Sequence, residues 1–164
     1  MAKEGERLAS LAAAVRESTL KRLRRVPAGA ENRRPDPEAM SFADLAAHIA
    51  DADRHLFAVL AGEERDPAAE GVLGPDRTQA EYGALLAELE RLGNERRDRL
   101  LELDDAALER VVHDVRFGET TIWWVVARGC LDHETHHRGQ IAAWLRLLRH
   151  PRASAAARPG QRGQ

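Results

Sequence analysis

The sequence predicts an all-α fold, a four-helix bundle with a short extended hairpin segment before the last helix. Its 164 residues suggest a single domain with enough interior for a core. Ala, Leu, Arg and Glu dominate and strand-forming residues are sparse, a composition that favours helices. Four long segments repeat apolar residues at helical spacing, separated by loops rich in Pro, Gly and charge. We expect the bundle to span residues 1–150 and residues 151–164 to form a disordered tail.

The first two helices have clear boundaries in the sequence. The first is expected over about 3–25, where Pro27 ends it, with Leu8 and Val15 on its apolar face. The second begins at Ser41, because Ser41 and Asp44 have the spacing of a capping box, and it runs to about residue 61.

The third helix is expected over about 79–103, after a second capping box formed by Thr78 and Glu81. Arg96 falls near the centre of its apolar face, and an inward arginine needs a partner. The favoured interpretation is a snorkelling or ion-paired structural arginine. The alternative is that its guanidinium holds an anionic group of a substrate.

Apolar and polar residues alternate over 110–121, which predicts a short extended segment or hairpin, and the last helix follows over about 121–149. Besides its inward face, this helix has a second apolar stripe on its back, formed by Trp124, Ala127, Leu131, Ala142 and Leu145. A bundle helix normally shows water a polar face, so this stripe predicts a homodimer. The alternative is that the hairpin or the first helix covers it.

Charge and cysteine content limit the partners and the compartment. The net charge of −2 gives no global basic field, so we expect no nucleic acid partner. The single cysteine, Cys130, excludes an internal disulfide and is typical of a reducing compartment. The longest apolar run, residues 122–127, is too short to span a bilayer, and no signal peptide opens the chain. These features predict a cytoplasmic protein with a small-molecule substrate and no membrane partner.

Three inward histidines are the candidate metal ligands. His133 and His137 lie four residues apart, which places both imidazoles on one face of the last helix, one turn apart. His48 is the polar member of the otherwise apolar face of the second helix. Three imidazoles from two helices can occupy one side of a divalent ion and leave positions for water and substrate. The alternative is that each is a hydrogen-bonded core histidine, and His55 lies too far along the helix to share an ion with His48.

Other polar residues near these histidines are weaker candidates for a role in the metal site. Gln140 continues the histidine face and could hydrogen-bond a metal-bound water. Asp44 and Asp51 lie one turn either side of His48 and could orient its ring, although a solvated acidic face is slightly favoured. Cys130 is expected to be a packing residue. Glu134 points about 100° away from His133 and is not assigned as a general base.

The segment DHETHHRGQI, together with SFADLAAHIADADR at the start of the second helix, resembles the DinB/YfiT-like proteins. The resemblance extends over nearly the whole chain, to about Leu148. It implies a helical bundle in which His48, His133 and His137 hold zinc or nickel, in proteins that are often dimeric. Some relatives are transferases or isomerases that use a low-molecular-weight thiol such as mycothiol, bacillithiol or glutathione.

The favoured hypothesis is therefore a metal-dependent enzyme, with a thiol-dependent S-transferase ahead of a hydrolase. A metal ion with an open position can lower the pKa of a bound thiol or of a bound water. The alternative is a non-catalytic bundle whose metal is structural or absent and whose role is one of interaction. The number of ligands separates the two, because a fourth protein ligand, from His136 or Cys130, would close the site.

Overall fold

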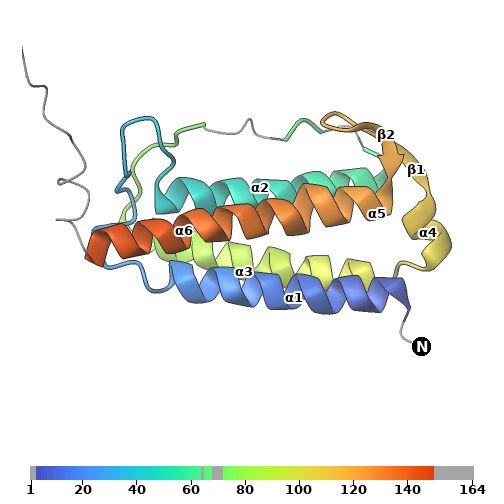
Figure 1. The fold of residues 1–164 in the computed structure, drawn as a ribbon, viewed down its shortest axis with the longest axis horizontal. Helices are drawn as coiled ribbons and strands as arrows, with labels where there is room; N and C mark the ends of the chain where they lie inside the picture. Colours follow the sequence, from blue (N-terminus) through green and yellow to red (C-terminus); the bar gives the residue numbers. More distant parts are fainter. Residues whose placement is uncertain (1–2, 64, 68–71, 150–164) are drawn as a thin grey trace, which may run out of the picture.

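The computed structural model describes residues 3–63, 65–67 and 72–149, and it confirms the predicted all-α fold (Figure 1). The expected tail, residues 151–164, lies outside the described residues. Along the chain the elements are α1 (Glu4–Leu23), α2 (Phe42–Ala61), α3 (Gln79–Leu101), α4 (Asp105–Glu109), β1 (Val111–Asp114), β2 (Gly118–Thr121), α5 (Ile122–Trp124), the π-helical segment η1 (Val125–Asp132) and α6 (His133–Arg149).

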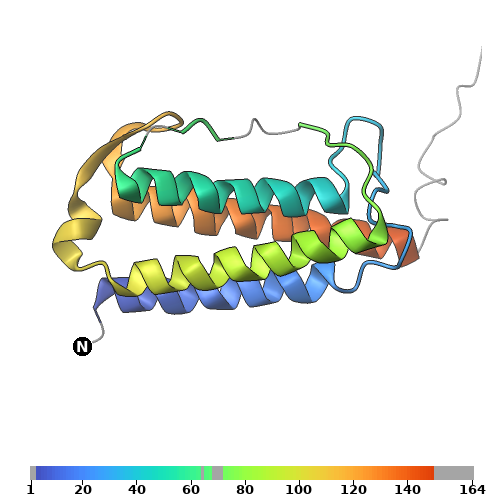
Figure 2. The same cartoon turned by 180° about the vertical axis from the view of Figure 1, so that it is seen from behind.

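The four long helical segments form two layers (Figures 1 and 2). One layer contains α1 and α3, and the other contains α2 and the continuous run of α5, η1 and α6. The two layers pack on each other through α1 with α6 and α2 with α3. This arrangement places α2 beside α6, which carry the three candidate metal ligands.

The helices begin where the capping signals predict. The amide of Asp44 donates to Ser41 Oγ at 3.1 Å, and the amide of Ser41 donates to the Asp44 carboxylate at 2.8 Å. Thr78 and Glu81 exchange the same pair of hydrogen bonds at the start of α3. α2 ends at Gly62, whose φ of 74° is the left-handed conformation that glycine adopts most readily.

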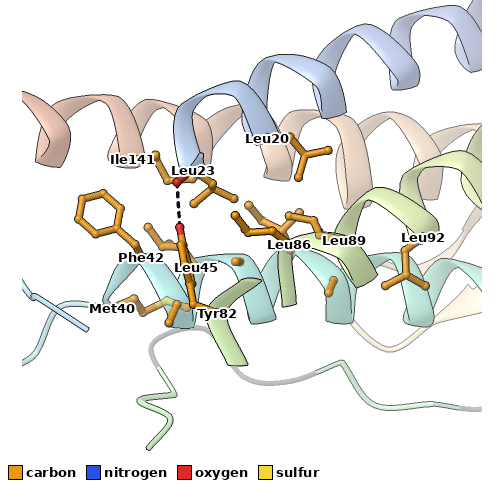
Figure 3. Close-up of a cluster of buried hydrophobic side chains, with 14 of the residues drawn as sticks. Leu20, Leu23, Met40, Phe42, Leu45, Tyr82, Leu86, Leu89, Leu92 and Ile141 are labelled. Atoms are coloured by element: carbon orange, nitrogen blue, oxygen red, sulfur yellow. Dashed lines mark hydrogen bonds between the residues drawn. The ribbon is translucent and has the colours of Figure 1, made fainter. Parts of the chain in front are cut away.

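The core is divided into two apolar clusters, one toward each end of the bundle. Figure 3 shows the first, where Leu20 and Leu23 of α1 meet Leu86 and Leu89 of α3, and the Tyr82 hydroxyl donates to the carbonyl oxygen of Leu23 at 3.1 Å. The second cluster lies toward the hairpin and contains Leu8, Leu56, Leu100, Leu108, Ile122 and Val126. In each of the four long helical segments, one buried charged residue separates the residues of the first cluster from those of the second.

Four buried charged side chains, one from each long helix, form this charged layer: Arg16, Asp53, Arg96 and Glu134. Arg16 bonds the carboxylate of Asp53 at 2.7 Å and that of Glu134 at 2.9 Å. Arg96 bonds the same two carboxylates, each at 2.9 Å. Two cations and two anions thus neutralise one another, as buried charges must.

The apolar stripe on the back of the last helix is not an unpartnered face. Leu131 is only 5% exposed and Leu145 only 7%, because each packs into one of the two core clusters beside residues of α1. The alternative interpretation, that the first helix covers the stripe, therefore holds for these two leucines. Trp124 is 43% exposed, and the homodimer stays a prediction.

The hairpin expected over 110–121 is confirmed as an antiparallel pair in which Val111 faces Thr121 and Asp114 faces Gly118. The short helix α4 and the π-helical form of η1 were not predicted. In the described part of the chain, no helix is both long and apolar enough to cross a membrane.

Candidate metal centre

The structure brings His48, His133 and His137 together with their Nε2 atoms facing one another. His48 comes from α2, and the other two come from the first turns of α6. The Nε2 atom of His133 lies 2.8 Å from that of His48 and 2.9 Å from that of His137. The three ligand atoms all lie within 4.8 Å of one another.

This donor set fits a divalent metal ion. In a neutral imidazole, Nε2 carries either one N–H or one lone pair, so Nε2 of His133 can form a good hydrogen bond with only one of the other two Nε2 atoms. Three unprotonated Nε2 atoms would instead direct three lone pairs at one point, which is what zinc, nickel and similar ions require. These three residues could hold one such ion.

Gln140 fixes the orientation of His137. Its amide oxygen lies 2.8 Å from Nδ1 of His137, and its amide nitrogen lies 3.2 Å from Nε2 of His136. The amide oxygen accepts, so Nδ1 of His137 carries the proton and Nε2 keeps its lone pair for a metal. We predicted Gln140 beside the site as a partner for metal-bound water, whereas the structure shows it bonded to a ligand histidine.

The environment keeps His133 in the neutral, ligating form. Burial, the neighbouring His137 and His48 rings and the more distant Arg116 lower the pKa of His133 to about 3. Its Nδ1 is buried and has no hydrogen-bond partner among the residues that the structure describes. A neutral ring at physiological pH binds a cation without first losing a proton.

The charged layer holds α6 in register beside the site. Glu134 follows His133 directly, and its carboxylate is 1% exposed between Arg16 and Arg96. Burial alone would raise the pKa of Glu134, but the two guanidinium groups lower it to about 2. Because a helix turns as a unit, fixing Glu134 toward α1 and α3 also fixes the direction of His133 toward α2.

The hairpin is tied to the helix one turn before His133. Arg116 donates to the carbonyl oxygen of Gly129 at 3.3 Å, and a Cβ atom at Gly129 would lie 2.5 Å from Arg116 Nη2. Asp114 holds Arg116 at 3.1 Å and also bonds Nε2 of the buried His55 at 2.8 Å. Gly129 lies within η1, and π-helical turns are frequent at functional sites.

A family model described as the DinB superfamily matches residues 11–141. The chain belongs to this superfamily. None of the curated proteins matches it.

Solved structures resemble this DinB-superfamily chain in fold. A DinB-like protein of Bacillus subtilis has a TM-score of 0.66 at 16% identity, covering 88% of this chain and 93% of the other. An uncharacterized protein of Clostridium difficile 630 has a TM-score of 0.61 at 13% identity, covering 90% and 98%. At such low identity these likenesses show the fold alone.

The remaining predicted site residues of this DinB-superfamily chain have structural partners. Arg96 is 1% exposed in the charged layer, where its Nη2 also donates to the carbonyl oxygen of Ala12 at 3.1 Å. Both terminal nitrogens are therefore occupied by protein acceptors, which fits the ion-paired interpretation rather than substrate binding. Cys130 is buried, its Sγ lies 3.6 Å from the carbonyl oxygen of Ala52, and burial raises the pKa of its thiol to about 12.

The two aspartates near His48 differ in role. Asp44 is buried, caps α2 and accepts from Arg34 and from the amide of Gly74, so it anchors the two long loops to the helix. Asp51 is half-buried and bonds Arg65. Asp44, Asp51 and His48 line one cavity of about 270 Å³, and a role of either aspartate in orienting the His48 ring stays a prediction.

Sequence reasoning missed the contacts that hold the ligands in place. Arg16, Asp53 and Glu134 each lie at the helical position of a core residue, which signals buried charges that need partners. Which charges pair is visible only in the structure, where both arginines bond the carboxylates of Asp53 and Glu134. For Asp114 and Arg116, the hairpin alternation indicated only that they lie on one side of a strand, and their partners come from α2 and η1.

Proposed function

We propose that this protein binds one divalent metal ion, zinc or nickel, through His48, His133 and His137 and uses it catalytically. The observation that carries the proposal is the convergence of the three Nε2 atoms. In the part of the chain that the structure describes, no fourth His, Cys, Asp or Glu side chain joins the group. Three protein ligands are typical of catalytic sites, whereas structural zinc sites have four.

The residues around the triad support an open, preorganised site. His136 is exposed and its Nε2 faces Gln140, while Cys130 is buried against α2, so neither of the two candidate closing ligands joins the triad. Gln140 orients His137, and Glu134 orients the helix that carries His133. When bound, the metal ion would supply a Lewis-acidic position that lowers the pKa of a coordinated thiol or water.

Transfer of a low-molecular-weight thiol to an electrophilic small molecule is the preferred reaction. This preference is supported by the segment DHETHHRGQI, which resembles that of the DinB/YfiT-like proteins. Some of those proteins use such thiols. The cavity of about 270 Å³ beside His48 is lined by two aspartates and two arginines. Arg54 pairs with Glu88 at 3.3 Å, so Arg77 is the guanidinium group that suits a substrate with a carboxylate. A thiol cosubstrate also requires a reducing compartment, and the lone buried Cys130 fits a cytoplasmic location.

Cobalt substitution tests thiol binding directly. Co²⁺ is loaded into the metal-free protein, and glutathione, mycothiol or bacillithiol is added while the near-ultraviolet and visible spectra are recorded. We expect a saturable thiolate-to-cobalt charge-transfer band in the protein and in the control His113→Ala, whose side chain is exposed on β1. The band should be absent in His137→Ala.

The same titration separates the alternatives. Failure of all three thiols to change the cobalt spectrum would overturn the thiol proposal while leaving metal binding intact. Hydrolysis of activated esters by the zinc form, lost in His137→Ala, would then favour the hydrolase. A cobalt spectrum that resists both thiol and competing anions would indicate a closed, structural site.

A further inference from the structure

A groove rich in basic residues lies between the C-terminal ends of α1 and α6. Its cavity has a volume of about 600 Å³. Both helices end toward the same end of the bundle (Figure 1). Along α6, the lining residue nearest to the triad is Ala142, five residues or about 7.5 Å of helix beyond His137, and none of the three histidines lines the groove. The groove is therefore separate from the histidine triad.

Among the residues that the structure describes, no acidic side chain lines this basic groove, and five cations do: Lys21, Arg22, Arg25, Arg146 and Arg149. The chain as a whole has a net charge of −2, so its composition does not explain a local excess of positive charge. Its other lining residues are Ser18, Ala142 and Leu145.

Helix-end electrostatics accounts for only part of this charge. Basic residues in the last turn of a helix stabilise its dipole, and Lys21, Arg22, Arg146 and Arg149 have such positions. Each helix C-terminus carries about half a negative charge, so the two ends together amount to about one. Five cations exceed that demand about fivefold, and a bound anion would relieve their mutual repulsion.

No carboxylate in the described part of the chain pairs with these cations. Within the described residues, Lys21, Arg25, Arg146 and Arg149 form no ion pair, and Arg22 donates only to the hydroxyl and carbonyl oxygens of Ser18. The adjacent Arg24, which points to α3, pairs with Glu90 at 2.7 Å. Ion pairing at this end of α1 thus occurs outside the groove and not inside it.

We propose that the basic groove binds a small organic phosphate with two or more phosphate groups, of the nucleoside diphosphate class. A guanidinium group can donate two parallel hydrogen bonds to a phosphate group, and four arginines line the groove. The volume lies within the range of ligand cavities, roughly 300–1,000 Å³. Ala142 and Leu145 give an apolar wall for the organic part. The concave shape and the negative net charge favour a small ligand over a nucleic acid, which needs an extended basic surface.

Calorimetric titration of the full chain with ADP and with pyrophosphate, at low ionic strength and without added Mg²⁺, tests the proposal. The groove variant Arg25→Gln/Arg146→Gln removes two exposed cations without disturbing the core. Its control, Arg91→Gln/Arg97→Gln, removes two exposed arginines from α3 and changes the net charge equally. We expect ADP to bind with a dissociation constant at least tenfold higher in the groove variant and within twofold of the original in the control.

A third variant, His137→Ala, excludes binding of the phosphate at the triad. Binding of ADP that survives in His137→Ala and weakens in the groove variant supports the groove. Absence of saturable binding of both ligands to the unmodified chain would overturn the proposal. So would equal affinity of the groove variant, or binding of a single-stranded oligonucleotide where ADP and pyrophosphate fail.

Discussion

Replacing Glu134 by Gln isolates the energetic contribution of the charged layer. Gln has nearly the shape of a protonated glutamate, and the pKa of Glu134 falls from 4.5 to about 2 in the folded protein. By linkage, this difference corresponds to about 3 kcal/mol of stability at neutral pH. Removing one partner of a buried ion pair typically costs a similar amount, about 3–5 kcal/mol, because the remaining charges are left uncompensated.

The assay is urea unfolding of the metal-free protein, followed by circular dichroism at pH 7. We expect Glu134→Gln to lower the free energy of unfolding by about 3 kcal/mol with an unchanged dependence on urea. The control is Glu95→Gln, which removes a more exposed glutamate paired with Arg91 and Arg99, and it should cost less than about 1 kcal/mol.

The pH dependence of this stability difference tests the direction of the pKa shift of Glu134. The folded-state pKa of Glu134 lies below its unfolded value, so its stabilising effect is complete above pH 4.5 and is lost as the pH falls toward 2. The difference between the two proteins should therefore shrink from about 3 kcal/mol at pH 7 toward zero near pH 2. A difference below 1 kcal/mol at pH 7, or one that does not change with pH, would refute the reasoning.

Three further predictions concern the ligand orientation, the hairpin and the assembly. Gln140→Ala should weaken zinc affinity about tenfold to a hundredfold in competition with a chromogenic chelator, because His137 loses its orienting partner; unchanged affinity would contradict this role. Gly129→Ala should cost about 1 kcal/mol in thermal unfolding, since a Cβ displaces Arg116 and breaks its hydrogen bond; a stabilised variant would show that the contact is unimportant. We expect a homodimer in sedimentation experiments, weakened by Trp124→Glu, and a monomer at high micromolar concentration would disprove it.

Local signals in the sequence were sufficient to locate the four long helices, although not the short helix α4. The capping boxes at Ser41 and Thr78 depend only on residues three positions apart, so they can be predicted without knowing the tertiary contacts. The order of helices around the bundle is not local. For that reason the sequence leaves open whether a second subunit, the hairpin or the first helix covers Leu131 and Leu145, and the structure shows that α1 covers both.

In the candidate site, too, local features could be predicted from the sequence and long-range contacts could not. The triad was predictable because His133 and His137 share a helix, and His48 is the polar residue of an apolar face. The partners that hold the site depend on contacts between elements far apart in sequence. Arg16 meets Glu134 across 118 positions, and no periodicity within either helix indicates which charges will pair.

Metal analysis of the purified chain tests the central claim most directly. The protein is equilibrated with a slight excess of Zn²⁺ or Ni²⁺, and unbound metal is removed. We predict one ion per chain, measured by inductively coupled plasma mass spectrometry. His48→Ala, His133→Ala and His137→Ala should each retain far less, while His113→Ala should match the original protein. Full occupancy in His48→Ala would contradict the claim that helices α2 and α6 share one metal ion.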